Sequence, residues 1–361
     1  MIQKFYLNMQ INSFNSKIFI EASTGTGLSE AIDSLAPSRI FVISDDNTHA
    51  RCLPLVEELL SGQKVHEITI GQGEANKRLE TVVKIWNHLQ EEGADSQSLV
   101  IALGGGMLLD VAGFAAGTFK RGIPLINVPT TLLSMVDASV GGKTGINFND
   151  YKNHIGVFRT PDYVFIFPAF LKTLDHRQLY SGWAEMVKHG MIHSQRHFER
   201  LMMSQPENLP DGEMALLIRD SVDIKNYYIA SDPYDKGIRK VLNLGHTLGH
   251  ALESLAMEKY QTLLHGEAVV YGLLCEYSLS MKLLGAGSTP YQQLKSHVSK
   301  YYSDLQLAEE DFPVIHRFLM QDKKNANEKI NFTLLQHIGK PVIDQFIEWD
   351  EIESCARKVL T

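Results

Sequence analysis

An apolar run that ends in three consecutive glycines constrains the fold of this chain more than any other feature. Residues 98–103 read Ser-Leu-Val-Ile-Ala-Leu, the glycines follow at 104–106, and a helical pattern covers 110–119. Such a short, continuous apolar run is typical of a strand buried on both faces. Glycines at its end let the backbone approach a helix or a ligand closely. The stretch predicts a buried strand that turns directly into a helix.

The same alternation extends through the first half of the chain. Strands over 39–44 and 124–129 and a helix over 79–89 indicate a parallel sheet with helices on its faces. After about residue 170 helical patterns dominate, and a polar loop with one short strand interrupts them between 322 and 335. The predicted helices cover 181–193, 212–228, 245–257, 266–284 and 290–302. We expect the two halves to pack closely, with a cleft between them.

Composition places the chain among ordinary globular proteins. It has 361 residues, 44% of them hydrophobic and 21% charged, and a net charge of −8, which argues against a nucleic-acid or acidic-membrane partner. Its three cysteines are far apart and fit no metal or redox spacing, so we expect reduced thiols. The first residues lack the basic-then-apolar build of a signal peptide, and no apolar run reaches membrane-spanning length. We therefore expect a cytoplasmic protein.

Histidines cluster in the second half. Asn243-Leu-Gly-His-Thr-Leu-Gly-His250 places His246 and His250 four apart on a predicted helix, and His265-Gly-Glu267 follows. Positions i and i+4 share a helix face, and clustered histidines with a carboxylate are typical zinc ligands. A metalloprotease helix is excluded, because Thr247 stands where its general-base glutamate belongs. The alternative is that these histidines only bond to backbone in the core.

Several loops that follow predicted strands suit a dinucleotide. Glycines 104–106 open a helix, whose first amides and dipole favour a pyrophosphate, although the Gly-x-Gly-x-x-Gly fingerprint is absent. Acidic and polar side chains at the end of the strand over 39–44 are placed to accept hydrogen bonds from a ribose. A plain strand-to-helix turn is the alternative for the glycines alone. The residues concerned are Asp45, Asp46, Asn47, Glu74, Lys77, Thr130 and Thr131.

The Gly-Lys-Thr sequence at 142–144 is not a phosphate-binding P-loop. Asp137 occupies the place of the first glycine of that motif, and no clear strand leads in. We interpret the stretch as a glycine-rich loop that presents Lys143, with Lys152 and Asn153 close behind, to an anionic substrate.

Taken in order between about residues 40 and 335, these motifs resemble 3-dehydroquinate synthase, the sugar-phosphate cyclase family of the shikimate pathway and aromatic amino-acid biosynthesis. The blocks that carry the resemblance are Gly104-Gly-Gly, Asp110, Lys120-Arg-Gly-Ile, Pro129-Thr-Thr-Leu-Leu, Val140-Gly-Gly-Lys-Thr-Gly-Ile-Asn, Trp183-Ala-Glu-Met-Val-Lys-His, Leu242-Asn-Leu-Gly-His-Thr-Leu-Gly-His and Leu264-His-Gly-Glu-Ala-Val.

The resemblance implies a Rossmann-like, NAD-binding α/β domain over 1–169, a mostly α-helical metal- and substrate-binding domain over 170–361, and a homodimer. It implies Zn²⁺, with Co²⁺ as an alternative, bound by Glu185, His246 and His265. His250 then acts in proton transfer or beside a ligand, and the helix pair His246 and His250 does not jointly hold the metal.

The resemblance also implies the other site residues. The catalytic residues are Lys143, Lys188, Lys225, Asp235, Arg239, Asn243 and His250. Substrate contacts fall on Asp137, Lys152, Asn153, a lysine of the pair Lys323 and Lys324, with the choice between them left open, and Arg121, which reaches into the partner subunit's site. NAD contacts fall on Asp45, Asn47, Glu74, Lys77, Gly105, Gly106, Asp110, Thr130, Thr131, Asp137, Lys143, Lys152, Phe170 and Thr173. One departure is Asp235, where the family usually has a glutamate.

The implied reaction converts 3-deoxy-D-arabino-heptulosonate 7-phosphate to 3-dehydroquinate and phosphate. It proceeds by transient NAD oxidation, β-elimination of phosphate, re-reduction and an intramolecular aldol step. Three alternatives stay open: a valiolone or inosose synthase type of cyclase, a metal-dependent polyol dehydrogenase that produces net NADH, and an inactive NAD-binding sensor. The anion-binding set, including Arg239 and Asn243, favours a substrate that carries both a carboxylate and a phosphate.

Overall fold

The computed structural model describes residues 8–13, 15–21, 27–60, 62–149, 151–259, 261–321 and 329–360. The chain forms two compact units. The first unit comprises Met1–Asp175 and Leu209–Asn226, and the second comprises His176–Asn208 and Tyr227–Thr361. The domain boundary predicted between 169 and 170 remains a prediction.

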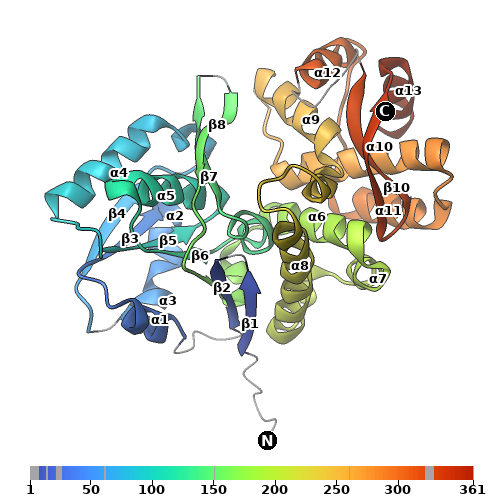
Figure 1. The fold of residues 1–361 in the computed structure, drawn as a ribbon. Coiled ribbons are helices and arrows are strands. Elements are labelled where there is room, and N and C mark those ends of the chain that lie inside the picture. The colour runs from blue at the N-terminus through green and yellow to red at the C-terminus, as the bar shows by residue number, and fades with distance from the viewer. Residues whose placement is uncertain are drawn as a thin grey trace, which may run out of the picture. The chain divides into compact units, whose positions relative to one another are not determined.

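A seven-stranded sheet forms the centre of the first unit (Figure 1). Its order is β1-β2-β9-β6-β5-β3-β4, and every pair is parallel except β1 with β2. The strand β3 connects outward to β4, whereas β5 connects toward β6, so the order reverses between β3 and β5. The strands are β1 (Asn8–Ser13), β2 (Ser16–Glu21), β3 (Ile40–Asp45), β4 (Val65–Ile70), β5 (Leu99–Gly104), β6 (Leu125–Pro129) and β9 (Tyr163–Ile166).

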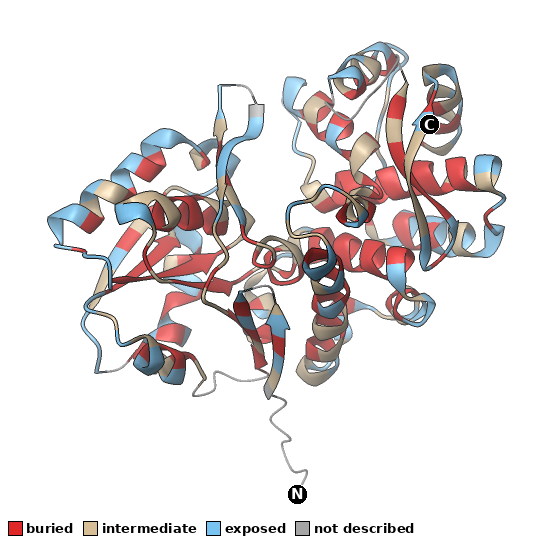
Figure 2. Cartoon of the chain, viewed as in Figure 1, coloured by how far each residue is buried: buried red, intermediate tan, exposed pale blue. Residues whose placement is uncertain are grey.

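Helices cover this sheet, and the central strands are buried along their length (Figure 2). The α-helices are α1 (Gly27–Leu35), α2 (Asp46–Arg51), α3 (Leu53–Glu57), α4 (Leu79–Glu91), α5 (Gly106–Thr118) and most of α8 (Asp211–Ser231). Short helical turns are η1 (Glu58–Leu60), η2 (Glu74–Asn76), η3 (Phe119–Arg121), the π-helical η4 (Ser134–Ala138) and η5 (Pro168–Thr173).

A separate antiparallel hairpin, β7 (Lys143–Phe148) with β8 (Tyr151–Phe158), packs on α5. Glycines make this contact close: a Cβ atom at Gly113 would lie 2.5 Å from Thr144, and one at Gly117 would lie 3.0 Å from Arg159. The predicted glycine-rich loop is confined to the residues before Lys143, including Gly141 and Gly142. Its predicted continuation was wrong, because Lys143 begins a strand and Lys152 and Asn153 lie on the partner strand. A strand at Gly-Lys-Thr agrees with the exclusion of a P-loop.

The second unit is mostly helical. Its helices are α6 (His176–His193), α7 (Gln195–Met203), η6 (Pro206–Asn208), η7 (Ile238–Asn243), α9 (His246–Glu258), α10 (His265–Leu284), α11 (Ser288–Tyr301), α12 (Asp311–Met320) and α13 (Trp349–Leu360). A hairpin of β10 (Ile330–His337) and β11 (Lys340–Ile347) packs against α10. The helix α10 is buried over most of its length (Figure 2). A parallel-sheet unit followed by a helical region confirms the predicted fold class.

Candidate active site

One carboxylate and two imidazoles meet in the second unit. Glu185 lies on α6, and His246 and His265 are the first residues of α9 and α10. The Glu185 Oε1 atom is 3.4 Å from the Nε2 atom of each histidine. The Glu185 side chain is fully buried, and those of His246 and His265 are 14% and 27% exposed. The three residues predicted to bind zinc therefore lie together, as a group able to hold a metal ion.

The spacing of these atoms fits a divalent cation. Zinc–ligand bonds of about 2.1 Å in a tetrahedral site place neighbouring ligand atoms about 3.4 Å apart. Neither carboxylate oxygen of Glu185 has a hydrogen-bond partner among the described residues, although Lys188 forms an ion pair with Oε2. A buried carboxylate without hydrogen-bond donors is unfavourable, and a bound cation would remove that penalty.

Each histidine is oriented by a contact at its other ring nitrogen. The Nδ1 atom of His265 lies 3.2 Å from the Glu253 carboxylate, and the Nδ1 atom of His246 lies 3.2 Å from the Leu244 carbonyl oxygen. Both acceptors favour a proton on Nδ1, which leaves Nε2 for a metal. Sequence reasoning missed Glu253, although His246, His250 and Glu253 follow the i, i+4, i+7 spacing of one helix face.

Lys188 determines much of the charge at the cluster. Burial alone would raise the pKa of Glu185, but Lys188 and the two histidines hold that pKa well below its ordinary value. Burial, together with Lys188, lowers the pKa of His246 to about 3, so its imidazole is neutral. Burial opposes protonation of His265, but the neighbouring carboxylates of Glu185 and Glu253 raise its pKa to about 10. The protonated imidazole carries a proton on Nε2 as well as on Nδ1, and a cation bound at Nε2 would displace the Nε2 proton.

Glycines bring the three helices close enough to form the cluster. A Cβ atom at Gly266 would lie 1.8 Å from the Ser181 carbonyl oxygen on α6, and the Gly266 amide donates to the Ser181 hydroxyl at 3.0 Å. A Cβ atom at Gly272 would lie 1.9 Å from the carbonyl oxygen of Gly245, which precedes α9 with a φ of 81°. These contacts explain why glycines accompany the histidines in the sequence.

His250 lies beside the cluster and is exposed. Its ring centroid is 5.2 Å from that of His246 and 5.9 Å from that of His265. With Glu253 and His265 it forms a second group that could hold a cation. The Nε2 atom of His265 faces Glu185, and its Nδ1 atom faces Glu253. The group of Glu185, His246 and His265 would therefore bind a cation through Nε2, while Nδ1 keeps its proton for Glu253.

Several of the predicted NAD contacts lie at or just after the carboxyl ends of strands in the first unit's sheet. Asp45, Gly104 and Pro129 end β3, β5 and β6, whose parallel arrangement brings their carboxyl ends to the same edge. In open α/β sheets ligands bind at this edge where the strand order reverses, which here is between β3 and β5. Gly105 precedes α5 without a side-chain cap, so the first amides of that helix remain available to an anion.

An ion pair between a buried lysine and a partly buried aspartate lies in the same region. Lys77 Nζ donates to Asp110 Oδ2 at 2.5 Å, and Lys77 is 5% exposed. Burial raises the pKa of Asp110 to about 6, against the opposing effect of Lys77. The hairpin joins this region, because Asn147 donates through its amide nitrogen to the Lys77 carbonyl oxygen and through its side chain to Glu74, both at 2.8 Å. The structure thus places Glu74, Lys77 and Asp110 together.

Two predicted cofactor residues have other partners at this edge. One carboxylate oxygen of Asp45 accepts from the amides of Asn47 and Thr48 and caps α2, so a ribose would have to use the other oxygen. The Phe170 ring is fully buried and packs edge-on against Phe167. Any contact from Phe170 would therefore come from its main chain. Thr173 follows it, and its carbonyl oxygen accepts from Arg51 at 3.2 Å.

Cationic residues of the first unit lie around the hairpin and η4. Asp110, Lys143 and Asn153 line one cavity of about 320 Å³, and Lys152 is exposed on β8. Lys225 Nζ is 2.6 Å from the Asp137 carboxylate and also donates to the Asp137 carbonyl oxygen. Thr130 is buried, and Thr131 bonds to Ser134 and faces Gly105.

The remaining predicted residues are more dispersed. Arg239 is buried in the second unit, where it donates to the Pro233 carbonyl oxygen at 2.9 Å, and Asn243 ends the same short helix η7. Asp235 has a φ of 57°, a left-handed conformation that a short acidic side chain tolerates better than most. Lys323 and Lys324 lie outside the described residues.

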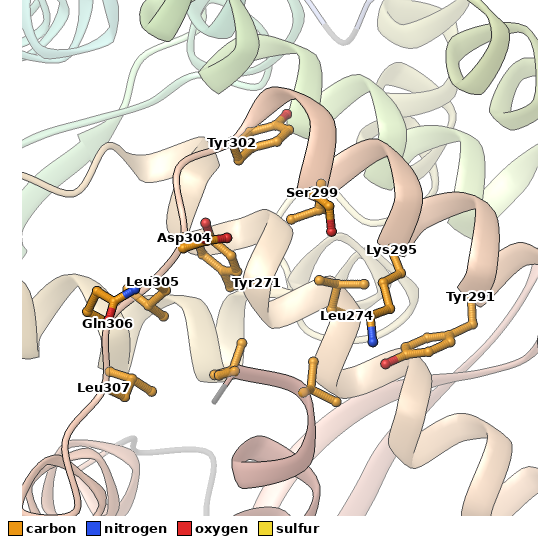
Figure 3. A pocket seen from close by; sticks show the side chains of 13 residues that line it. Tyr271, Leu274, Tyr291, Lys295, Ser299, Tyr302, Asp304, Leu305, Gln306 and Leu307 are labelled. Carbon is orange, nitrogen blue, oxygen red and sulfur yellow. The ribbon is translucent and has the colours of Figure 1, made fainter.

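The second unit has a further cavity of about 380 Å³ (Figure 3). Helices α10 and α11 supply Tyr271, Tyr291 and Lys295, and the segment after α11 supplies Asp304. None of the described residues that line it belongs to the predicted site, so it is separate from the metal cluster.

Solved structures similar to this chain include sugar-phosphate cyclases and, at lower TM-scores, alcohol and glycerol dehydrogenases. A 2-deoxy-scyllo-inosose synthase complexed with carbaglucose-6-phosphate, NAD⁺ and Co²⁺ is 25% identical, with a TM-score of 0.85 over 98% of this chain and 100% of that one. A 2-epi-5-epi-valiolone synthase from Streptomyces hygroscopicus with NAD⁺ and Zn²⁺ bound has a TM-score of 0.81 at 23% identity, covering 97% and 98% of the two chains. The fold is therefore one shared with sugar-phosphate cyclases, and the Glu-His-His cluster adds a group able to hold a metal ion.

The chain belongs to the 3-dehydroquinate synthase family. The family's N-terminal model matches residues 67–181, and its C-terminal model matches residues 182–325. A 3-dehydroquinate synthase from Parabacteroides distasonis is 41% identical over 336 residues, which cover 93% of this chain and 95% of the relative. One from a Sulfurovum species is 38% identical, covering 89% of this chain and 91% of the relative. These matches confirm the resemblance inferred from the sequence.

Proposed function

We propose that this chain is a 3-dehydroquinate synthase, a phosphorus–oxygen lyase that converts 3-deoxy-D-arabino-heptulosonate 7-phosphate to 3-dehydroquinate and phosphate. The observation that carries the proposal is that Glu185, His246 and His265 lie together in a chain of this family. The Glu185 Oε1 atom is 3.4 Å from each histidine Nε2, which is the separation of neighbouring ligand atoms around a zinc ion. NAD⁺ and a divalent cation would supply hydride acceptance and Lewis-acid polarisation of the substrate hydroxyl when bound. Glu185, His246 and His265 would hold the cation, and the carboxyl edge of β3, β5 and β6 would hold NAD.

The protein's own residues would bind the two anionic ends of the substrate. Lys188 is buried and Lys143 is exposed at the start of the hairpin, so the two lysines differ in their access to solvent. Arg239 is held by the Pro233 carbonyl, which fixes its planar donor group for a carboxylate or phosphate. Exposed His250 is placed to exchange a proton with solvent and the cluster. We propose these residues as charge-stabilising and proton-transfer groups.

The test is phosphate release with three substrates: the heptulosonate phosphate, a heptulose phosphate and a hexose phosphate. The proposal predicts phosphate release from the heptulosonate alone, without net accumulation of NADH. Preference for either of the other sugars would identify a valiolone or inosose synthase type of cyclase. Net NADH without phosphate release would identify a polyol dehydrogenase, and NAD binding without turnover would identify a sensor.

We propose further that the enzyme works as a homodimer and that Arg121 contacts the partner's site. Arg121 is exposed, and it follows Lys120 in a left-handed turn with φ values of 48° and 67°. Two non-glycine residues in this conformation cost about 1 kcal/mol or more each. We interpret this backbone conformation as a means of directing the Arg121 side chain toward the partner subunit.

Subunit mixing tests the dimer. Arg121→Ala and His246→Ala subunits, each inactive alone, would form heterodimers that contain one intact site if Arg121 acts across the interface. A 1:1 mixture should then recover activity in about a quarter of all sites. Recovery of none, with exchange verified by mass spectrometry, would place Arg121 in its own subunit's site.

The proposed compartment is the cytoplasm. Its support is the three cysteines, Cys52, Cys275 and Cys355, which are all free and buried. Separately, among the described residues no helix has the length and apolar character needed to cross a membrane. Fractionation of cells that produce the tagged protein would test this compartment.

A further inference from the structure

We propose that Glu253 and Glu276 are positioning residues that fix the two metal-binding histidines by reciprocal contacts between α9 and α10. Glu253 on α9 orients His265 of α10, and Glu276 on α10 holds the start of α9, where His246 lies. The inference rests on the metal site of the proposed function and concerns residues outside the predicted ligand set.

The first contact acts on the ring of His265. The Glu253 carboxylate lies 3.2 Å from His265 Nδ1, and the Glu253 side chain is 10% exposed. A carboxylate at Nδ1 selects the tautomer with its proton there, limits rotation of the ring and increases the basicity of Nε2. The same histidine directs Nε2 to Glu185 at 3.4 Å. Glu253 therefore acts through His265 and does not need to touch the cation.

The second contact acts on the helix that carries His246. Glu276 has no exposed surface, and its Oε2 accepts from the Gly245 amide at 2.5 Å while Oε1 lies 3.4 Å from the Leu248 amide. Gly245 provides no side-chain cap for α9. A helix start without a cap leaves unsatisfied amides and a positive dipole end, and a carboxylate satisfies both. Because His246 is the first residue of α9, this cap fixes its backbone.

The two contacts lie on one close helix pair. The Gly245 carbonyl oxygen would be 1.9 Å from a Cβ atom at Gly272, which is one turn before Glu276 on α10. At this separation the Glu276 side chain reaches the amides of α9 directly. A shift of either helix would break one carboxylate contact and move one histidine. The arrangement therefore couples the positions of His246 and His265.

Zinc affinity of the metal-stripped protein tests the inference, measured by competition with a chromophoric chelator. Glu253→Met keeps the side-chain volume and removes the acceptor, and we expect a loss of affinity of about 10- to 100-fold. Glu253→Gln keeps a weaker, neutral acceptor and should lose several-fold. Glu276→Gln keeps one acceptor and removes the charge, and it should lose about ten-fold. Glu258→Gln is the matched control: it removes an exposed carboxylate of α9 that pairs with Arg317, and its affinity should equal that of the wild type.

Cobalt spectra provide a second readout. With Co²⁺ in place of zinc, the visible bands report ligand geometry, and the Glu253 variants should change them while Glu258→Gln should not. Unchanged zinc affinity in Glu253→Met and Glu276→Gln would overturn the inference, even if both variants melt earlier. Glu253→Gln decides for Glu253 if the methionine variant does not fold. A wild-type protein that binds no zinc would instead contradict the metal site of the proposed function.

Discussion

The Glu185 Oε1 atom lies 3.4 Å from the Nε2 atom of His246. Burial and Lys188 keep this imidazole neutral, because they lower its pKa to about 3. The pair is therefore a carboxylate facing a nitrogen lone pair, an arrangement that repels unless a cation lies between the two atoms.

This relationship distinguishes His246 from His250. His246→Ala should abolish turnover and weaken zinc binding by more than the roughly 10- to 100-fold typical of a residue that only orients a ligand. His250→Ala should slow turnover by about a hundred-fold and retain zinc, because loss of a proton-transfer group affects chemistry and leaves the ligand set intact. Steady-state phosphate release and bound zinc per subunit measure both. Equal zinc loss in the two variants would contradict the ligand assignment.

Gly266→Ala should prevent the approach of α10 to α6. Its Cβ atom would lie 1.8 Å from the Ser181 carbonyl oxygen, a backbone atom that no side-chain rotation can move. We expect a loss of about 3 kcal/mol or more in the free energy of unfolding, together with lower zinc content. Urea denaturation measures the first effect. Gly212→Ala is the control, since nothing lies within 4 Å of its added Cβ atom; its stability should stay within about 1 kcal/mol of wild type.

His297 should make the protein sensitive to acid. Burial lowers the pKa of His297 to about 4 from an ordinary 6.5, so the unfolded state binds a proton more tightly than the folded state. The stabilising contribution of neutral His297 is complete above pH 6.5 and is lost as pH falls toward 4, by up to about 3 kcal/mol. His297→Phe should lose less stability than the wild type between pH 7 and pH 4.5. The exposed His337→Phe should follow the wild type; the same behaviour in both variants would disprove the role of His297.

Breaking the ion pair of Lys77 and Asp110 should make the folded state less stable as pH rises, whereas His297 makes it less stable as pH falls. Burial raises the pKa of Asp110 from 3.8 to about 6, so a folded chain holds this proton more tightly and loses stability as pH rises through that range. Lys77→Met removes the compensating charge and should destabilise more at pH 8 than at pH 5, where Asp110 takes up a proton. Asp110→Asn leaves a buried ammonium and should cost about 3 kcal/mol. Thermal melts at both pH values measure the difference; an equal loss for Lys77→Met at pH 5 and pH 8 would contradict it.

Local patterns were sufficient to predict the elements that bury continuous apolar surface. The strand predicted at 98–103 is β5 at Leu99–Gly104, and the helix predicted at 266–284 is α10 at His265–Leu284. The hairpin of β7 and β8 was not predicted, because its glycines resemble those of a loop. In the structure Gly145 and Gly156 lie opposite each other in the hairpin, and a Cβ atom on either would meet the backbone of the other strand. The terminal helix α13 and the antiparallel β1 also lacked a recognisable local signal.

The family motifs were sufficient to predict that the three metal ligands share one site, although these ligands lie on three separate helices. They did not indicate the carboxylates that hold those ligands. Glu253 and Glu276 act on residues 12 and 31 positions away, so only the packing of α9 on α10 reveals their role. The capping of α2 by Asp45 was missed for a related reason, because an acid after a strand suits a helix cap and a ribose equally well.

The most direct test of the account is an anomalous difference map from crystals of the zinc-loaded protein, collected at the zinc absorption edge. The account predicts one peak per subunit, about 2.0–2.2 Å from Glu185 Oε1, His246 Nε2 and His265 Nε2. A peak held instead by His250, Glu253 and His265, or no peak in this cluster, would contradict it.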